Sequence, residues 1–128
     1  MTTQITPAHA AALPEWPITG IHRVEASAGT GKTFALALLH TRLVVERALP
    51  VKRILAVTYT IAATQELRER LRVQLGRAAE LALLDVPALT EKSLSADAAE
   101  AMTATVLLRR IEHELAPALA ARLRRAVG

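Results

Sequence analysis

Apolar side chains recur along this chain at helical spacing over two long stretches, and shorter apolar runs precede each of them. Over residues 32–49 they cover one broad side of an expected helix, which Pro50 ends. A second helix is expected from Ile61 to about Leu84, because leucines recur every fourth residue and Thr60 suits its N-cap. The pattern therefore predicts two long helices in the first two thirds of the chain.

Two short segments, residues 22–25 and 53–58, are expected to be strands; the first is short for a strand, but it lies where a strand is expected, before a loop and a helix. The second is bounded by a basic turn and a Thr-Tyr-Thr sequence, as expected of a strand buried on both faces. With the helix between them, these strands predict a βαβ unit. The expected fold class is α/β, with a small parallel sheet and a helical C-terminal half.

The remaining segments have different patterns. Pro7, Pro14 and Pro17 favour an extended lead-in over residues 1–20. Residues 87–95 are expected to form a loop, after which Ser95 caps a helix with acids in its first turns. An apolar stripe continues to the end, and Pro117 is expected to kink or divide it.

Composition narrows the class of protein. The 128 residues suit about one small domain, and with 2% aromatic residues the core must be mostly leucine, alanine and valine. The net charge is +4, and arginine outnumbers lysine thirteen to three, which suits phosphate contact but also fits a compositional preference for arginine. There is no cysteine, so disulfides and thiolate metal sites are excluded. Without an apparent signal sequence or apolar membrane span, a soluble cytoplasmic protein is expected.

Residues 26–33 have the pattern of a phosphate-binding loop, and they lie between an expected strand and an expected helix. The usual pattern is G-x-x-x-x-G-K-[ST]; Ala26 replaces the first glycine, whereas Gly31, Lys32 and Thr33 keep their places. Small residues let backbone N–H groups surround phosphate oxygens at the positive end of a helix. Lys32 is expected to reach the β and γ phosphates, and Thr33 to hold Mg²⁺. The predicted ATP site comprises Ala26, Ser27, Ala28, Gly29, Thr30, Gly31, Lys32 and Thr33.

A second segment, Val57–Leu71, follows the second expected strand. Taken with Glu25–Phe34, it resembles the first two motifs of superfamily 1 DNA helicases of the UvrD type, and most closely the RecB branch, the helicase and nuclease subunit of exodeoxyribonuclease V. The Trp16–Gly20 sequence and the Ala62-Ala63 pair followed by Glu66-Leu67-Arg68 support that branch. The resemblance covers about residues 16–75.

This resemblance implies the N-terminal part of an ATP-dependent DNA helicase and exonuclease subunit that acts in double-strand break repair and recombination. It implies a RecA-like P-loop NTPase domain, with ATP and Mg²⁺ as cofactors. The implied partners are single-stranded DNA at a duplex end and RecC- and RecD-like subunits. Residues 21–84 would then be the P-loop core of helicase domain 1A, and 85–128 a helical segment of an incomplete domain.

The family lines its DNA path with the second motif, which transfers a DNA-binding role to Thr58, Tyr59 and Thr60. Hydroxyls and N–H groups at a strand end bind phosphate, and an aromatic ring stacks on bases. Packing of Tyr59 where strand meets helix is the alternative. Ile61 and Gln65 stand where the family often has polar or acidic residues, so this part of the pattern is altered.

Several groups that hydrolysis requires are missing: an acid for Mg²⁺, a group that orients water, and an arginine for the developing charge. Asp85 follows an apolar run, but its surroundings indicate the end of a helix. The four histidines show no metal-ligand spacing. The fragment is therefore expected to bind nucleotide weakly and hydrolyse little. A small P-loop kinase or stand-alone ATPase, and a non-enzymatic helical binding module with a degenerate nucleotide site, remain alternatives.

Overall fold

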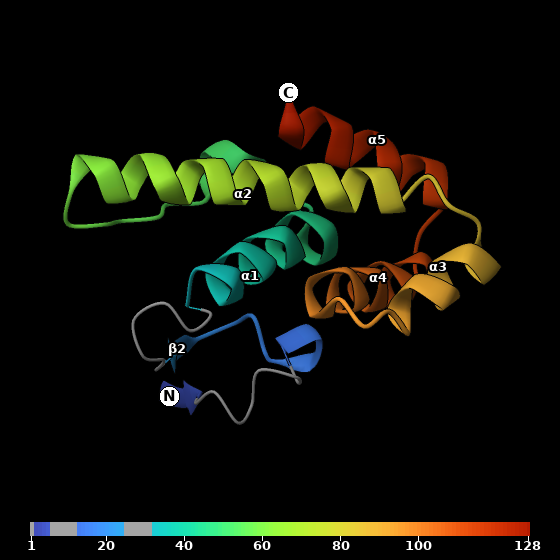
Figure 1. Cartoon of the computed structure of the whole chain (residues 1–128), viewed down its shortest axis with the longest axis horizontal. Helices are drawn as coiled ribbons and strands as arrows, with labels where there is room; N and C mark the ends of the chain where they lie inside the picture. Colours follow the sequence, from blue (N-terminus) through green and yellow to red (C-terminus); the bar gives the residue numbers. More distant parts are fainter. Residues whose placement is uncertain (1, 6–12, 25–31) are drawn as a thin grey trace.

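The computed structural model describes residues 2–5, 13–24 and 32–128, most of which are helical (Figure 1). In Figure 1, α1 lies between the strands and α2, and α5 runs along the C-terminal half of α2. In chain order the elements are β1 (Thr2–Ile5), β2 (Ile21–Val24), α1 (Lys32–Arg47), η2 (Val51–Arg53), α2 (Ile61–Leu81), α3 (Val86–Ser93), α4 (Ala98–Ile111) and α5 (Ala116–Val127).

The predicted α/β fold is wrong for this chain, because its helices do not flank a sheet made of the two expected strands. A strand does form at Ile21–Val24, but it pairs in parallel with β1, with Thr2 beside Ile21 and Ile5 beside Val24. Residues 51–53 form the short 3₁₀ helix η2, and residues 54–58, expected to be the second strand, belong to no described helix or strand. The physical reason is that a strand needs a neighbour for its backbone hydrogen bonds, whereas a helix satisfies its own.

The two long helices form where the periodicity predicts them. The Thr60 hydroxyl caps α2 by accepting a hydrogen bond from the Ala63 N–H at 3.0 Å. Helix α1 ends at Arg47; the next residue, Ala48, has a left-handed φ of 53°, and the Leu49 N–H then bonds back to the Leu43 carbonyl at 3.3 Å. The start of α2 and the end of α1 therefore both follow from neighbouring residues, and these two boundaries depend little on contacts with the rest of the fold.

Two expectations for the C-terminal half are wrong and one is confirmed. The expected loop at 87–95 is instead α3, because Asp85 caps it through the Ala88 N–H at 2.9 Å and Pro87 lies in its first turn, where no backbone donor is needed. Asp97, not Ser95, caps α4. Pro117 does divide the apolar stripe, since α4 ends at Ile111 and α5 begins at Ala116.

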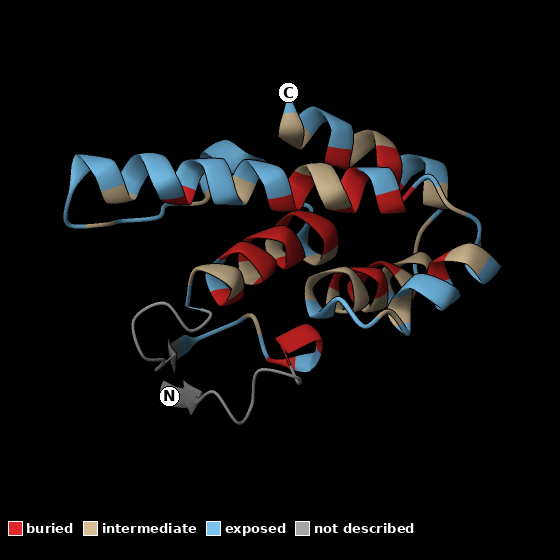
Figure 2. Ribbon diagram, in the orientation of Figure 1, coloured by how far each residue is buried: buried red, intermediate tan, exposed pale blue. Residues whose placement is uncertain are grey.

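The core lies where α1, α2, α4 and α5 meet, and the C-terminal half of α2 contributes most of that helix's buried residues (Figure 2). The N-terminal half of α2 extends beyond this core, with mostly exposed side chains. The largest fully buried apolar side chains of the core are leucines and valines, as the low aromatic content requires: Leu13, Leu38, Leu89, Leu107, Leu119, Leu123, Val44, Val45 and Val106.

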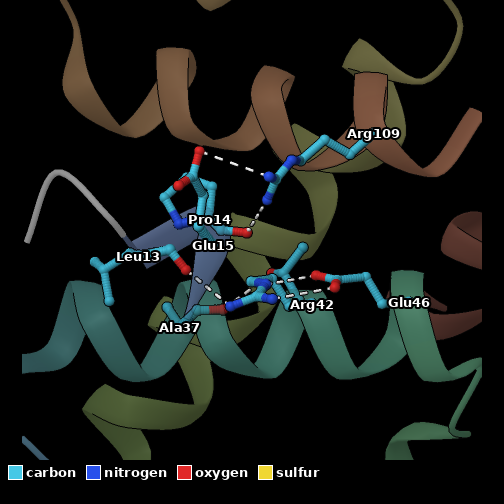
Figure 3. A network of polar contacts seen from close by, with 8 residues as sticks. Leu13, Pro14, Glu15, Ala37, Arg42, Glu46 and Arg109 are labelled. Carbon is cyan, nitrogen blue, oxygen red and sulfur yellow. Dashed lines mark hydrogen bonds and ion pairs between the residues drawn. The ribbon is translucent and has the colours of Figure 1, made fainter. Parts of the chain in front are cut away.

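Two arginines tie the segment before β2 to this helical core (Figure 3). Arg42, only 4% exposed, donates to the Leu13 carbonyl at 2.8 Å and to the Glu46 carboxylate on the next turn of α1. Arg109 of α4 donates to the Pro14 carbonyl at 3.0 Å. The two guanidiniums therefore bind backbone carbonyl groups of the segment before β2, and these charge-assisted hydrogen bonds fix the segment against the core.

Candidate nucleotide and nucleic-acid site

Lys32 and Thr33 are the first two residues of α1, so the end of the predicted phosphate loop coincides with a helix N-terminus. The Lys32 side chain is exposed and Thr33 is half-buried. The first turn of α1 contains no acidic side chain, so nothing there opposes an anion. The other six predicted site residues, 26–31, lie outside the described residues.

Three threonine hydroxyls gather at the start of α2. Thr58 and Thr64 share a hydrogen bond between their Oγ1 atoms, and the Thr64 hydroxyl also donates to the Thr60 carbonyl at 2.9 Å. Because the Thr60 hydroxyl also accepts a hydrogen bond from the Ala63 N–H, the cluster links the segment before α2 to the first turn of that helix. Thr64 was missing from the predicted set; its position four residues after the N-cap is the signal that could have identified it.

Tyr59 projects away from this cluster. Its side chain is fully exposed, so the alternative in which the ring packs between strand and helix is wrong. An exposed ring beside a helix N-terminus is available to stack on another planar group. The backbone N–H groups of Ile61 and Ala62, in the first turn of α2, have no hydrogen-bond partner among the described residues.

The arginines of the helices are of two kinds, exposed and largely buried. Arg68 and Arg72 are exposed on α2, and Arg70 there pairs with Glu66 at 3.7 Å, as the spacing predicts. Arg122 is instead largely buried: it donates to the Val44 carbonyl at 3.0 Å and also binds the Glu114 carboxylate. The Arg122 and Arg110 guanidiniums hold the pKa of Glu114 below its usual value, since they stabilise the carboxylate. Arg122 is thus a structural residue.

The remaining candidates have structural places. Asp85 caps α3, as its surroundings at the end of a helix indicate. Within the described part of the chain, no three histidine, aspartate or glutamate side chains lie close enough together to hold a metal ion. No described helix is long and apolar enough to cross a membrane. No described hydrogen bond or ion pair joins Lys32 or Thr33 to the threonine cluster, so the two halves of the candidate site remain separate.

Comparison with known families decides the relationship. The model of the UvrD/REP helicase N-terminal domain matches residues 6–119, which include the predicted phosphate loop, the threonine cluster and most of the helical core. The chain belongs to the UvrD/REP helicase N-terminal domain family. This membership confirms the helicase resemblance and favours it over the kinase and binding-module alternatives.

Within the UvrD/REP helicase family, the chain is similar to RecB subunits of RecBCD enzymes. It is 55% identical to that of Mycolicibacterium smegmatis over 64 residues, 50% of this chain and 6% of the relative. It is 48% identical to that of Escherichia coli over 64 residues, 44% of this chain and 5% of the relative. The matches therefore span about one twentieth of the relatives' length. No solved structure matches the chain significantly.

Proposed function

We propose that this chain is the nucleotide-binding N-terminal part of a RecB-like, ATP-dependent DNA helicase and exonuclease subunit. The observation that carries the proposal is the family match over residues 6–119, within which Gly31-Lys32-Thr33 leads directly into α1. In this proposal residues 26–33 bind the phosphates of ATP, the Lys32 ammonium neutralises the terminal phosphates, and the Thr33 hydroxyl is a ligand of Mg²⁺. The exposed ammonium and the unopposed helix N-terminus fit an anionic group.

The DNA-binding part of the proposal rests on the start of α2. The open N–H groups of Ile61 and Ala62 would bind a backbone phosphate, and the exposed Tyr59 ring would stack on a base, with Thr58 and Thr60 holding the turn between them. Such contacts follow the backbone and the base face without reading sequence, which suits an enzyme that moves along DNA. In the cytoplasmic parent enzyme, RecC- and RecD-like subunits would be the partners. The process would be the repair and recombination of broken DNA ends.

Bound ATP supplies the energy for DNA movement in a helicase, but hydrolysis needs an acid for Mg²⁺ and a group that orients water. The described residues contain no acidic cluster for this purpose, and Asp85 is used as a helix cap. The chain is therefore proposed to bind Mg-ATP weakly and to hydrolyse little of it alone.

Titration of the chain with Mg-ATP by isothermal calorimetry tests the nucleotide site. We expect Lys32→Ala to abolish binding, because the ammonium is the main charge that faces the terminal phosphates. Lys52→Ala is the matched control, since Lys52 is an exposed lysine on η2 outside the predicted loop and its loss should leave binding unchanged. Equal binding by the native chain and the Lys32→Ala variant would contradict the proposal.

A further inference from the structure

Arg42 of α1 contacts the segment that leads into β2, away from the residues expected to touch nucleotide. It lies ten residues after Lys32, which is about 15 Å along the helix from the predicted phosphate-binding end. Its guanidinium donates to the Leu13 carbonyl at 2.8 Å, and the Glu46 carboxylate binds the same guanidinium through both oxygens (Figure 3). An effect of Arg42 on nucleotide binding would therefore act through the parts of the chain that it holds together.

The segment that Arg42 contacts is itself fixed in the core. Leu13 is 1% and Trp16 is 9% exposed, and the Leu13 carbonyl also accepts a hydrogen bond from the Trp16 N–H at 3.5 Å. Gly20, with a φ of 82° that favours glycine, then turns the chain into β2, which begins at Ile21. A short and firmly held segment thus connects the Arg42 contact to the first residue of β2.

The elements β2 and α1 stand on either side of residues 25–31, which include most of the predicted phosphate loop. The described backbone hydrogen bonds of β2 join it to β1 and not to α1. Arg109 also holds the segment before β2, at the Pro14 carbonyl, but it does so from α4. Arg42 by contrast provides a direct polar link from α1, the helix that begins with Lys32, to the segment that leads into β2.

We propose that Arg42 is a positioning residue for the nucleotide site and that Glu46 orients it. By holding Leu13 on α1, the Arg42 guanidinium fixes β2 relative to Lys32, and so fixes the two elements between which the phosphate loop is expected. Glu46 acts through Arg42, because its carboxylate sets the plane of the guanidinium so that one N–H group faces the carbonyl. The inference rests on the proposed nucleotide-binding function. A site held in its binding geometry loses less conformational entropy when the ligand binds, so loosening one side lowers the affinity.

Calorimetric titration of the full chain with Mg-ATP tests this role, with every variant shown to be folded by circular dichroism. We expect Arg42→Met to weaken binding at least about tenfold, because small displacements of a binding constellation are costly. Arg122→Met is the matched control: Arg122 also binds backbone carbonyls of α1 and a glutamate, but it has no described contact with the segment before β2. Its affinity should stay within about twofold of the native value. A role of Arg42 in stability alone predicts the same result for both variants.

Two milder variants keep the test possible if Arg42→Met does not fold. Glu46 is 29% exposed, so Glu46→Ala should fold, and its affinity should fall about threefold because the guanidinium loses its orientation. Arg42→Lys keeps one donor for the Leu13 carbonyl and should bind more tightly than Arg42→Met. The Arg42→Lys/Glu46→Ala double variant should lose less than the sum of the single effects, since Glu46 acts through the guanidinium. Additive losses would contradict that order of action.

A distance measurement tests the positioning without nucleotide. The chain has no cysteine, so spin labels can be attached specifically to Ile21→Cys in β2 and Leu36→Cys in α1, at positions that are 67% and 50% exposed. We expect Arg42→Met to broaden the distribution of distances between the labels in electron paramagnetic resonance, and Arg122→Met to leave it as narrow as in the otherwise native chain. A distribution unchanged by Arg42→Met would overturn the inference, whatever the variant does to binding.

The outcomes separate this inference from the proposed function. If the native chain binds Mg-ATP and Arg42→Met binds it equally well, Arg42 has no positioning role, while the proposed function stands. If the native chain does not bind Mg-ATP, the proposed function is wrong and the role of Arg42 toward nucleotide is wrong with it. Weaker binding by Arg42→Met, with unchanged binding by Arg122→Met and a broadened distance distribution, supports both.

Discussion

At the scale of single residues, the buried polar groups of the helical core are mostly paired within the chain. Gln74 donates to the Thr103 hydroxyl at 2.6 Å between α2 and α4, and Thr41 bonds back to the Ala37 carbonyl at 2.9 Å. Two described buried side-chain nitrogens lack a hydrogen bond, but the Arg110 Nε atom still lies 3.5 Å from the Glu114 carboxylate. The Nδ1 atom of His40 has no comparable compensation, so His40 should determine how stability responds to mild acid.

Burial lowers the pKa of His40 from its ordinary 6.5, because the apolar surroundings disfavour the imidazolium. The unfolded chain therefore binds a proton more readily than the folded chain below that value, and stability falls as the pH falls. We expect the unfolding free energy from urea titrations to decrease between pH 7.5 and pH 5.5, by at most about 1.4 kcal/mol per pH unit for one proton.

Two variants isolate the His40 contribution. His40→Leu should flatten the pH dependence over this range, while His113→Gln, which alters an exposed histidine, should leave it intact. Glu114 does not interfere, since its lowered pKa confines its loss of stabilisation to pH values below about 4.5. A slope that survives in His40→Leu would assign the acid sensitivity elsewhere.

At the scale of elements, local residues account for most of the helix boundaries. Thr60 indicates the start of α2 correctly, and Pro50 indicates the end of α1 to within two residues, because capping and proline effects depend on a few neighbouring residues. Pro87 was misinterpreted as part of a loop, although proline favours the first turn of a helix as much as it disfavours the interior. The strand expected at 53–58 could not be decided locally, since pairing depends on a partner elsewhere in space.

Gly76 and Ala48 each occupy a backbone position that favours the other residue type. Gly76 lies inside α2 with open space where a Cβ would project, and Ala48 has a left-handed φ of 53° at the end of α1. We expect Gly76→Ala to stabilise the fold by about 0.5–1 kcal/mol, through reduced backbone entropy in the unfolded chain. Ala48→Gly should raise the unfolding free energy by about 1 kcal/mol, because it relieves the steric cost of the left-handed conformation.

Chemical denaturation of both single variants and of the double variant measures these effects. The sites lie in different helices, so the gains should add to within about 0.5 kcal/mol. Ala37→Gly, at a buried alanine inside α1, is the matched control and should be destabilising. A stabilising effect there would contradict the argument from backbone conformation.

At the scale of the whole molecule, the sequence predicted components better than their assembly. The helix expected after the predicted phosphate loop begins at Lys32, and Tyr59 and Thr60 lie at the start of α2. The burial of Arg42 and the partial burial of Arg122 could not be foreseen, because a charged residue on a helix usually faces solvent and only the packed fold reveals the carbonyls it binds. The helices could thus be predicted from the sequence, whereas the long-range polar contacts that fix their arrangement could not.

Arg122 provides the clearest test of that assembly, because it joins α5 to the last turn of α1 and to the α4–α5 connection. Its guanidinium donates to the Val44 carbonyl at 3.0 Å and the Val45 carbonyl at 2.7 Å, and it pairs with Glu114. We expect Arg122→Met to lower the unfolding free energy by about 2–3 kcal/mol, because two carbonyls and a largely buried carboxylate lose a charged donor.

A lysine at the same position distinguishes geometry from charge. Arg122→Lys keeps the positive charge, but a single ammonium cannot reproduce the planar set of donors that binds both carbonyls and the carboxylate, so it should recover less than half of the loss. Arg124→Met, at an exposed position on the same helix, should change stability by less than about 0.5 kcal/mol. If Arg122→Lys were as stable as the native chain, the charge alone would hold α5 in place and the carbonyl contacts would be incidental. If Arg122→Met were as stable as the native chain, the connection between α5 and α1 would depend on the apolar contacts of Leu119 and Leu123 alone.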